Sequence, residues 1–137
     1  MTEYRYEVTV LPVSDVEAAK RFYADTLGWN LDTDFAPNDA FRVVQVTPPG
    51  SAASVSFGTG ISSSEPGSYR GMHLVVTDIE EAREDIAGRG VDLKGPFWFG
   101  PEGQTDGPHP ERADYGTYLQ FSDPDGNVWL VQEVRGS

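Results

Sequence analysis

The sequence predicts an α+β fold made of two similar halves, and three observations lead to this prediction. A short apolar strand followed by Val-Ser/Thr-Asp-Val/Ile-Glu occurs twice, around Asp15 and around Asp78, at an offset of 78 − 15 = 63 residues in a chain of 137. Each copy enters a helical pattern, and each helical pattern is followed by short β-like runs joined at Gly and Pro turns. Successive strands with short connections favour α+β over a parallel α/β sheet.

Both helices are predicted to begin in the same way. Ser14 and Thr77 are N-cap candidates, and Glu17 and Glu80 follow three residues later, which is the spacing of a capping box. A glycine stands after each helical pattern, where C-terminal caps belong. The apolar stripes are Val16, Ala19, Phe22 and Tyr23 in the first copy, and Ile79, Ala82 and Ile86 in the second.

Three strands are expected after each helix, one of them short and immediately following the helix. The turns between the later strands contain Pro-Gly and Asp-Gly, which favour chain reversal. The expected strands lie near residues 30–32, 41–46 and 54–57 in the first copy, and near 91–93, 118–121 and 127–131 in the second.

The halves are predicted to form one domain over residues 1–137, with module 1 at about 4–60 and module 2 at about 69–135. Residues 60–68, rich in Gly and Ser, are expected to join the modules. Residues 94–116 carry many Gly and Pro without periodicity, so they are expected to form a long loop, and a loop of that length inside a compact domain is usually functional or disordered.

Charge and composition exclude several functions. The formal net charge is −12, which opposes binding to nucleic acid or to an anionic membrane surface. The chain has no cysteine, which excludes disulfides and thiolate chemistry and fits a reducing compartment. No apolar run is long enough to span a bilayer, and the first residues lack a secretory pattern, so a cytoplasmic location is expected.

Together these motifs resemble the vicinal-oxygen-chelate family, the glyoxalase, bleomycin-resistance and dioxygenase group. The shared motifs are Val13-Ser14-Asp15 with Phe22-Tyr23 and Leu27-Gly28, and the late Asp123-Pro124-Asp125-Gly126-Asn127. The resemblance implies two βαβββ modules that form a half-barrel with a concave ligand cavity. It also implies a homodimer, as in many members.

Metal-using members of this family take ligands from four positions on the concave face. The spacing of the family motifs places these positions at Val8, Ser54, Gly71 and Leu130. None of these side chains is a good ligand for a divalent cation, which prefers carboxylate, imidazole, thiolate or water. The resemblance therefore implies a member without the usual metal ligands, and no metal or other cofactor is expected.

Strand alternation predicts which side chains line the cavity. The expected lining is largely apolar with a few polar groups, which is typical of a pocket for an apolar or aromatic organic molecule. Side chains at even positions of the second module's first strand, Met72, Leu74 and Val76, should instead face the helix. The expected ligand-binding residues are Val8, Val10, Ser54, Ser56, Gly71, His73, Trp98, Tyr118, Leu130 and Gln132.

His73 is the candidate catalytic residue, because imidazole titrates near neutrality and suits acid-base chemistry. The alternative is a hydrogen-bonded structural histidine. His109 lies between prolines in the long loop, where exposure to solvent is the simpler expectation, although this loop would also serve as a lid. The aromatic cluster Phe97-Trp98-Phe99 suits a pocket wall, a dimer contact or packing beneath the loop.

Three functions remain open. The first is a protein that binds and sequesters a small molecule, such as an antibiotic or an aromatic metabolite. The second is a metal-independent isomerase, lyase or cyclase that uses His73 as acid or base. The third is a metal-dependent glyoxalase or dioxygenase with displaced ligands such as His73 and His109. Walker-type, dinucleotide-binding and nucleophile-elbow motifs are absent from the sequence.

Overall fold

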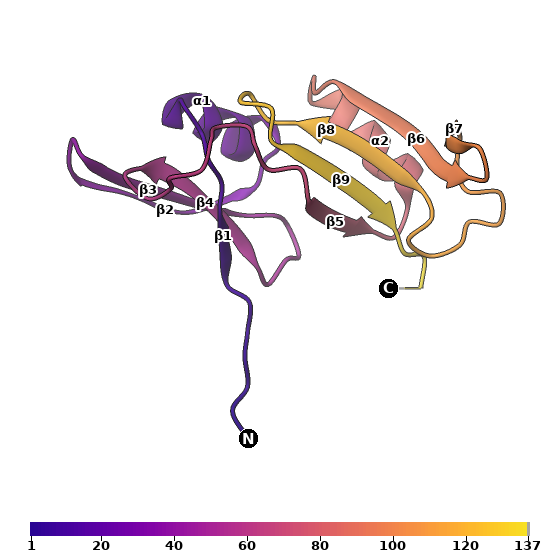
Figure 1. Ribbon diagram of the computed structural model, residues 1–137, viewed down its shortest axis with the longest axis horizontal. Helices are drawn as coiled ribbons and strands as arrows, with labels where there is room; N and C mark the ends of the chain where they lie inside the picture. Colours follow the sequence, from indigo (N-terminus) through magenta and orange to yellow (C-terminus); the bar gives the residue numbers. More distant parts are fainter. Residues whose placement is uncertain (137) are drawn as a thin grey trace. The chain divides into compact units, whose positions relative to one another are not determined.

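The computed structural model describes residues 1–136, which form two compact units. The first unit comprises residues 1–69 and, from much later in the chain, residues 124–127. The second comprises residues 70–123 and the chain from residue 128 onward. Each unit contains one sheet and one helical segment (Figure 1).

The first unit contains a four-stranded sheet of order β1-β4-β3-β2. Strands β1 and β4 are parallel, whereas β4, β3 and β2 are antiparallel neighbours. The helix between β1 and β2 starts as an α-helix and continues as a π-helical stretch, η1. The bounds are β1 (Val8–Val10), α1 (Val16–Lys20), η1 (Arg21–Thr26), β2 (Asn30–Asn38), β3 (Phe41–Thr47) and β4 (Ser54–Thr59).

The helical segment of the first unit packs on one face of its sheet through Tyr23. This side chain is fully buried, and its ring centroid lies 5.3 Å from that of Trp29 and 5.6 Å from that of Phe57. Val44 and Val46 are also completely buried, at alternate positions of β3. Alternation leaves the residues between them for the opposite face of the sheet.

The second unit contains a five-stranded sheet of order β5-β9-β8-β6-β7, again with a parallel pair, β5 and β9, at one edge. In Figure 1 its helix α2 lies behind β8 and β9. The bounds are β5 (Met72–Val76), α2 (Ile79–Gly88), β6 (Leu93–Gly100), β7 (Gly103–Asp106), β8 (Tyr118–Ser122) and β9 (Val128–Glu133).

The core of the second unit lies between α2 and its sheet. Alternate residues of β8 and β9 are buried, and the rings of Phe121 and Trp129 stack with centroids 6.3 Å apart. On β5, Met72, Leu74 and Val76 are less exposed than the residues between them, as predicted for the face toward the helix. The predicted alternation of strand β5 is confirmed, and Trp129, which is buried, belongs to this core.

Both helices begin at an aspartate, not at the hydroxyl residue predicted. Asp15 accepts a hydrogen bond from the Ala18 amide, and Asp78 accepts from the amides of Glu80 and Glu81. The predicted capping boxes at Ser14 and Thr77 are therefore wrong by one residue. A carboxylate at this position satisfies free amides and also interacts favourably with the helix dipole.

Residues 124–127, between β8 and β9, belong to the first unit. The buried Asn127 side chain donates to the carbonyl oxygen of Pro12 at 3.0 Å and accepts from the Tyr69 amide at 3.1 Å. Asp125 accepts hydrogen bonds from the backbone and hydroxyl of Ser14, the latter at 2.5 Å. Ser14 thus binds this turn instead of capping its own helix.

The predicted long loop over residues 94–116 is wrong over much of its length, because most of β6 and all of β7 lie within it. A β-bulge between Lys94 and Phe97 hid the strand from pattern analysis. Gly95 at the bulge has φ +109°, and a Cβ added there would lie 2.6 Å from the Tyr118 carbonyl oxygen. Only glycine fits this backbone without strain.

The α+β fold class and the βαβββ order of the two modules are confirmed, with β7 as an additional strand in the second module. The other predicted strands are found within a few residues of their predicted ends, although β2 and β6 are considerably longer than the short strands expected. Among the described residues, no helix is both long enough and apolar enough to cross a membrane.

Candidate functional site

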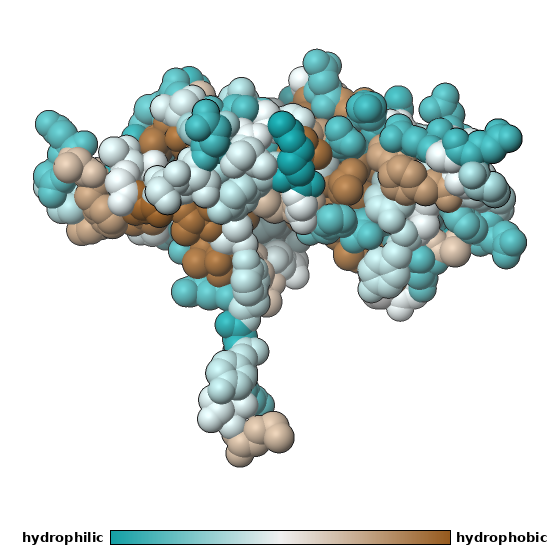
Figure 2. All heavy atoms as spheres, viewed as in Figure 1, coloured by the Kyte–Doolittle hydropathy of each residue, from teal (hydrophilic) through white to brown (hydrophobic). Residues whose placement is uncertain are grey.

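The face of the second sheet opposite α2 is the candidate site, and we call it the open face. Residues directly paired across strands point to the same side, so the register defines two rows of side chains on it. Figure 2 views this side and shows brown and tan hydrophobic residues over β8 and β9, surrounded by hydrophilic ones. The rows are His73, Leu130, Gln120 and Lys94, and Val75, Gln132, Tyr118 and Phe97.

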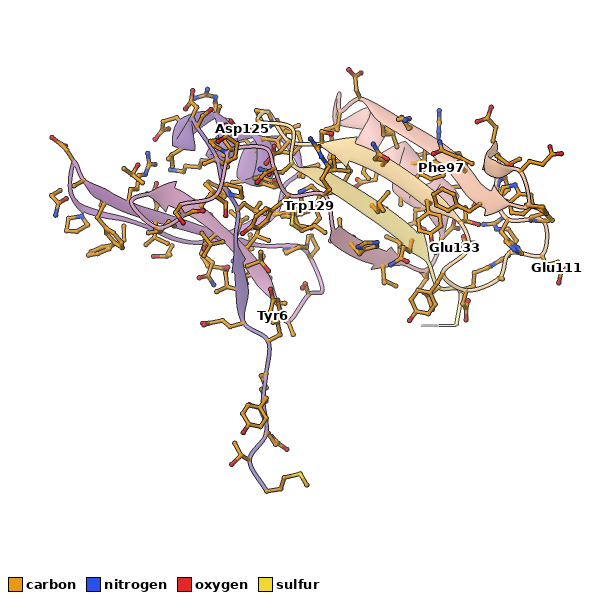
Figure 3. All side chains as sticks on the ribbon, viewed as in Figure 1. Tyr6, Phe97, Glu111, Asp125, Trp129 and Glu133 are labelled. Carbon is orange, nitrogen blue, oxygen red and sulfur yellow. The ribbon has the colours of Figure 1, made fainter. Side chains whose placement is uncertain are left out.

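Aromatic rings gather at one end of the open face (Figure 3). The rings of Phe97 and Tyr118 stack at a centroid distance of 5.7 Å and an interplanar angle of 17°. Phe99 meets Tyr118 edge-on at 5.4 Å and is 59% exposed, whereas Phe97 is 2% exposed. The bulge at Gly95 makes this possible, because it brings Phe97 into register with Tyr118. A planar aromatic ligand would contact the exposed Phe99 and the half-buried Tyr118, because the Phe97 ring is covered and packs against both.

His73 is exposed, and its ring is oriented by one hydrogen bond. Its Nδ1 lies 2.8 Å from the carbonyl oxygen of Gly71. A carbonyl oxygen only accepts, so Nδ1 carries the proton and donates it. In the neutral side chain Nε2 is then left with a lone pair, available to a ligand as an acceptor or a base.

The open face differs in charge from the protein as a whole. Although the chain carries a net charge of −12, the two rows contain no carboxylate from β5 to β6. Their polar groups are the amides of Gln120 and Gln132 and the imidazole of His73, and Lys94 supplies the only charge in these rows. Neutral donors and acceptors on an apolar surface suit an uncharged organic molecule.

The expected binding residues of the first unit lie on its own sheet, on the face away from the helix. The register pairs Val8 with Ser54 and Val10 with Ser56, as the sequence pattern indicated. The Ser54 hydroxyl lies 2.6 Å from the Thr47 hydroxyl, which in turn donates to Asp32. Ser54 is 9% exposed, so its hydroxyl is occupied within the unit.

The four positions at which the resemblance implies metal ligands carry a poor donor set in this structure. Val8, Gly71 and Leu130 have no donor atom in their side chains, and the Ser54 hydroxyl is engaged by Thr47. In the second sheet Leu130 is paired with His73, two residues beyond the Gly71 position that motif spacing indicated. The residues at these positions do not fit a divalent cation.

Trp98 is separate from the other expected binding residues of the second unit. It alternates with Phe97 and Phe99 and therefore points to the other side of β6, where its ring lies 5.3 Å from that of His109. Sequence reasoning chose Trp98 and omitted Phe97, Phe99 and Gln120. The alternation in Phe97-Trp98-Phe99 was a usable signal, but it requires the strand that the Gly95-Pro96 bulge obscured.

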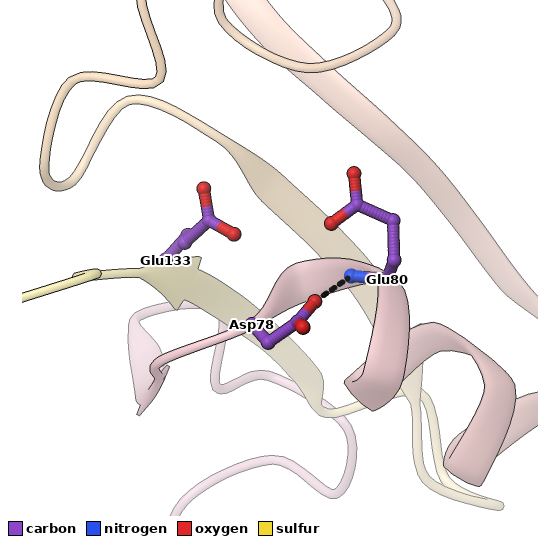
Figure 4. A group of neighbouring side chains, drawn as sticks. All are labelled: Asp78, Glu80 and Glu133. Carbon is purple, nitrogen blue, oxygen red and sulfur yellow. Dashed lines mark hydrogen bonds between the residues drawn. The ribbon is translucent and has the colours of Figure 1, made fainter.

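A group of three carboxylates lies at the end of β9, away from the open face (Figure 4). Oxygen atoms of Asp78, Glu80 and Glu133 lie within 4.8 Å of one another. Glu133 is 1% exposed and shares the buried face of β9 with Trp129 and Val131. Neither histidine belongs to this group, which is the one cluster of potential metal ligands among the described residues.

Arg112 already binds two of these three carboxylates. Its guanidinium donates to both oxygens of Glu133, at 2.9 and 2.6 Å, and to Glu80 at 2.8 Å, while the Ile79 amide donates to Glu133 at 2.9 Å. The hydrogen bonds from Arg112 hold the pKa of Glu133 below its usual range. A cation would have to displace the guanidinium, so the arrangement is explained as an ion-pair network.

A similar network accounts for Arg42 in the first unit. Its guanidinium donates twice to Asp34, at 3.0 and 2.8 Å, and once to Glu17, and Lys20 also donates to Asp34. Hydrogen bonds from Arg42, and then from Lys20, hold the pKa of Asp34 well below its usual range. Arg42 is therefore committed to partners within its unit and is not free to bind a ligand carboxylate.

Comparisons with known proteins agree with this fold. The family model for the Glyoxalase/Bleomycin resistance protein/Dioxygenase superfamily matches residues 5–131. The uncharacterized protein YetH of Bacillus subtilis strain 168 is 26% identical over 123 residues, covering 88% of this chain and 91% of YetH.

Two solved structures are similar over nearly the whole chain. TnmS3, an antibiotic binding protein from Streptomyces sp. CB03234, is 32% identical, with coverage of 97% of this chain and 98% of TnmS3 and a TM-score of 0.75. A superfamily member from Sphaerobacter thermophilus is 31% identical, with coverage of 96% and 98% and a TM-score of 0.73. The chain belongs to the glyoxalase, bleomycin resistance protein and dioxygenase superfamily.

Proposed function

We propose that this protein binds a small, uncharged aromatic organic molecule on the open face and sequesters it without chemical change. The observation that carries the proposal is the stacked pair Phe97 and Tyr118 beside the amide of Gln132. The aromatic rings supply apolar contact area, and the amide and the imidazole of His73 supply orientation.

The relatives support a binding role. TnmS3 is described as an antibiotic binding protein, and a second structure from the same Streptomyces strain, 32% identical with a TM-score of 0.71, as a glyoxalase/bleomycin resistance protein. We infer an antibiotic or an aromatic metabolite as the ligand class of this chain. We further propose that binding is independent of metal, because the side chains at the four family positions are poor ligands.

A neutral planar dye tests the binding proposal. Nile red titrated into the protein should gain fluorescence with saturation, and Tyr118→Ala should weaken its affinity by about tenfold, the scale of a lost aromatic contact. Tyr4→Ala is the matched control, because Tyr4 is 92% exposed on the N-terminal segment and should leave affinity unchanged. Equal affinity in all three proteins would contradict the assignment of the open face.

Metal content tests the second part of the proposal. Elemental mass spectrometry of untagged protein should find no stoichiometric Ni, Zn, Fe or Mn, and a chelator should leave both the melting temperature and Nile red binding unchanged. One equivalent of metal with loss of stability in chelator would restore the metal-dependent alternative.

A metal-independent enzyme is the second candidate, and the orientation of His73 favours it. Because Nδ1 donates its proton to the Gly71 carbonyl oxygen, Nε2 of the neutral ring carries a lone pair and can act as a base. Once a ligand is known, His73→Ala separates the two functions. Loss of turnover with retained binding identifies an enzyme, whereas a change in affinity alone identifies a binding protein.

A further inference from the structure

The chain between β7 and β8 forms an ordered turn at the end of the open face, and its centre is His109. The His109 amide donates to the hydroxyl of the fully buried Thr117 at 3.0 Å, and the His109 carbonyl accepts from the Arg112 amide at 2.9 Å. The next residue after Thr117 is Tyr118. We call residues 109–113 the His109 turn.

The imidazole of His109 holds this turn as an acceptor. Its Nδ1 lies 3.1 Å from the Glu111 amide and 3.4 Å from the Ala113 amide. A backbone amide only donates, so Nδ1 must carry a lone pair, and the proton of the neutral ring resides on Nε2. The ring packs edge-on against Trp98, and a Cβ at Gly116 would lie 3.0 Å from its Cδ2.

The two histidines of the chain therefore occupy opposite tautomers. His73 donates from Nδ1 and can accept a second proton on Nε2 without losing its hydrogen bond. His109 accepts at Nδ1, so a second proton on that atom removes the acceptor. The N–H of the protonated ring would then face the N–H groups of Glu111 and Ala113, and both hydrogen bonds would be lost. Acid thus affects the two sites differently.

We propose that His109 is a positioning residue whose protonation opens the His109 turn and thereby loosens the end of the open face. The His109 turn is connected to the open face by only a few residues of the chain. The turn leads through Tyr115, whose amide donates to the Glu133 carbonyl at 2.8 Å, and Thr117, whose carbonyl accepts from the Glu133 amide at 3.1 Å. Tyr118 and Gln132, the adjacent residues, are paired on the open face.

The charged groups near the His109 turn would not cause the same opening between about pH 5 and pH 7.5. Arg112 is held by Glu133 and by Glu80 of α2, and Asp114 accepts from the Arg135 amide. Glu111 on the turn and Asp106 on β7 are exposed, and Trp98 contributes no charge from β6. Carboxylates titrate near pH 4 and arginine stays charged, so histidine is the side chain that changes charge between about pH 5 and pH 7.5.

The tautomers are tested first, without any ligand. Nitrogen-15 NMR of the imidazoles resolves two histidines, which single substitutions assign. At about pH 7.5 the neutral ring of His109 should show an unprotonated Nδ1, and that of His73 a protonated Nδ1. A His109 ring protonated at Nδ1 would overturn the proposal.

Amide exchange then tests the opening. Protection factors at Glu111, Ala113 and Tyr115 should fall by about tenfold between about pH 7.5 and pH 5, the scale of a lost hydrogen bond. His109→Asn keeps an acceptor oxygen at the δ1 position but does not titrate, so its protection should stay high at both pH values. His109→Leu should be unprotected at both. His73→Asn is the matched control and should retain the wild-type pH dependence.

The effect on ligand binding rests on the proposed function and is measured separately. Nile red affinity should weaken in acid for the wild type and not for His109→Asn. A pH-dependent loss of protection without any dye binding would support the His109 turn and contradict the binding proposal. Protection factors that are the same at both pH values, or equally pH-dependent in His109→Asn, would overturn the role of His109.

Discussion

The two modules share an order of elements but differ in what they place at equivalent positions. Seven residues after the turn glycine, the first module has Phe57 (57 − 50 = 7) and the second has Glu133 (133 − 126 = 7), and both are buried beneath the helix side of their sheets. Phe57 packs on Tyr23, whereas Glu133 binds Arg112 and the Ile79 amide. The same backbone position thus accepts an apolar core residue or a buried charge with a full set of partners.

On the sheet faces away from the helices, the polar position described is in the first unit and the aromatic cluster is in the second. In the first unit the small polar residue Ser54 is bonded to Thr47, which binds Asp32. In the second unit Tyr118, Phe97 and Phe99 form an aromatic cluster on that face. The two halves therefore keep the same order of shared strands while the chemistry of each face differs. The first face carries its own aromatic pair, Phe35 and Phe41, at a centroid distance of 6.4 Å, and the second carries a cluster of three rings in the same sheet as Gln132 and His73.

The largest effects on stability are expected from truncating the two side chains at equivalent positions, Phe57 and Glu133. Phe57→Ala should lower the free energy of unfolding by about 3–5 kcal/mol through loss of buried area and a cavity. Glu133→Ala should cost about 2–4 kcal/mol, because it leaves the Ile79 amide and Arg112 without their acceptor, although Arg112 retains some contact with solvent. Urea denaturation measures both.

The control for these variants is Phe99→Ala, which removes a phenylalanine that is 59% exposed and should cost less than about 1 kcal/mol. A Glu133→Ala variant as stable as the wild type would contradict this comparison. It would show that the buried carboxylate does not stabilise the second module as Phe57 stabilises the first.

Acid should weaken both modules by protonating carboxylates that are bound to arginine, Asp34 in the first and Glu133 in the second. The pKa values of Asp34 and Glu133 are lowered in the folded protein by hydrogen bonds from Arg42 and Arg112. A lowered folded pKa gives stabilisation that is present above the unfolded value, near pH 4, and is lost as pH falls through the folded value. The free energy of unfolding should therefore decrease steadily below about pH 5.

Asp34→Asn and Glu133→Gln separate the contributions of the two modules. Each variant should reduce the pH dependence of the free energy of unfolding that comes from its own module and leave that of the other module unchanged. Urea denaturation at neutral and acidic pH measures the dependence. Full retention of the wild-type slope in Glu133→Gln would show that its ion pair with Arg112 does not stabilise the folded state.

The helix caps should show the smallest difference between the modules. Asp78 satisfies two amides of α2 and Asp15 satisfies one of α1. Asp78→Ala should therefore lower the melting temperature more than Asp15→Ala, with costs of about 1–2 and 0.5–1 kcal/mol respectively. Substitution by Asn keeps the acceptor and should be nearly neutral in both. An equal cost at the two sites would contradict the role of the second hydrogen bond.

Much of the fold was predictable, because repeats, apolar stripes and turn dipeptides are local signals. The side of β5 that carries Met72, Leu74 and Val76 follows from strand alternation alone. The caps were misplaced by one residue because Ser-Asp and Thr-Asp each offer two competing acceptors, and Ser14 is used instead by the distant Asp125.

The candidate site was less accessible from sequence because it depends on a bulge and on pairing across strands. Gly95 and Pro96 read as loop residues, so Phe97 and Phe99 were not placed beside Tyr118. The partners of His109 and Arg112 lie up to 32 residues away in sequence, and no local pattern identifies them. Of the expected residues in the second unit, His73 with Leu130 and Tyr118 with Gln132 are direct cross-strand neighbours.

The turn that closes the first unit has a consequence for any attempt to divide the chain. Asn127 comes from the second half of the sequence yet binds Pro12 and Tyr69. A fragment of residues 1–69 would lack Pro124–Asn127, which belong to the same compact unit. The first unit therefore cannot be obtained whole by cutting the chain at a single point.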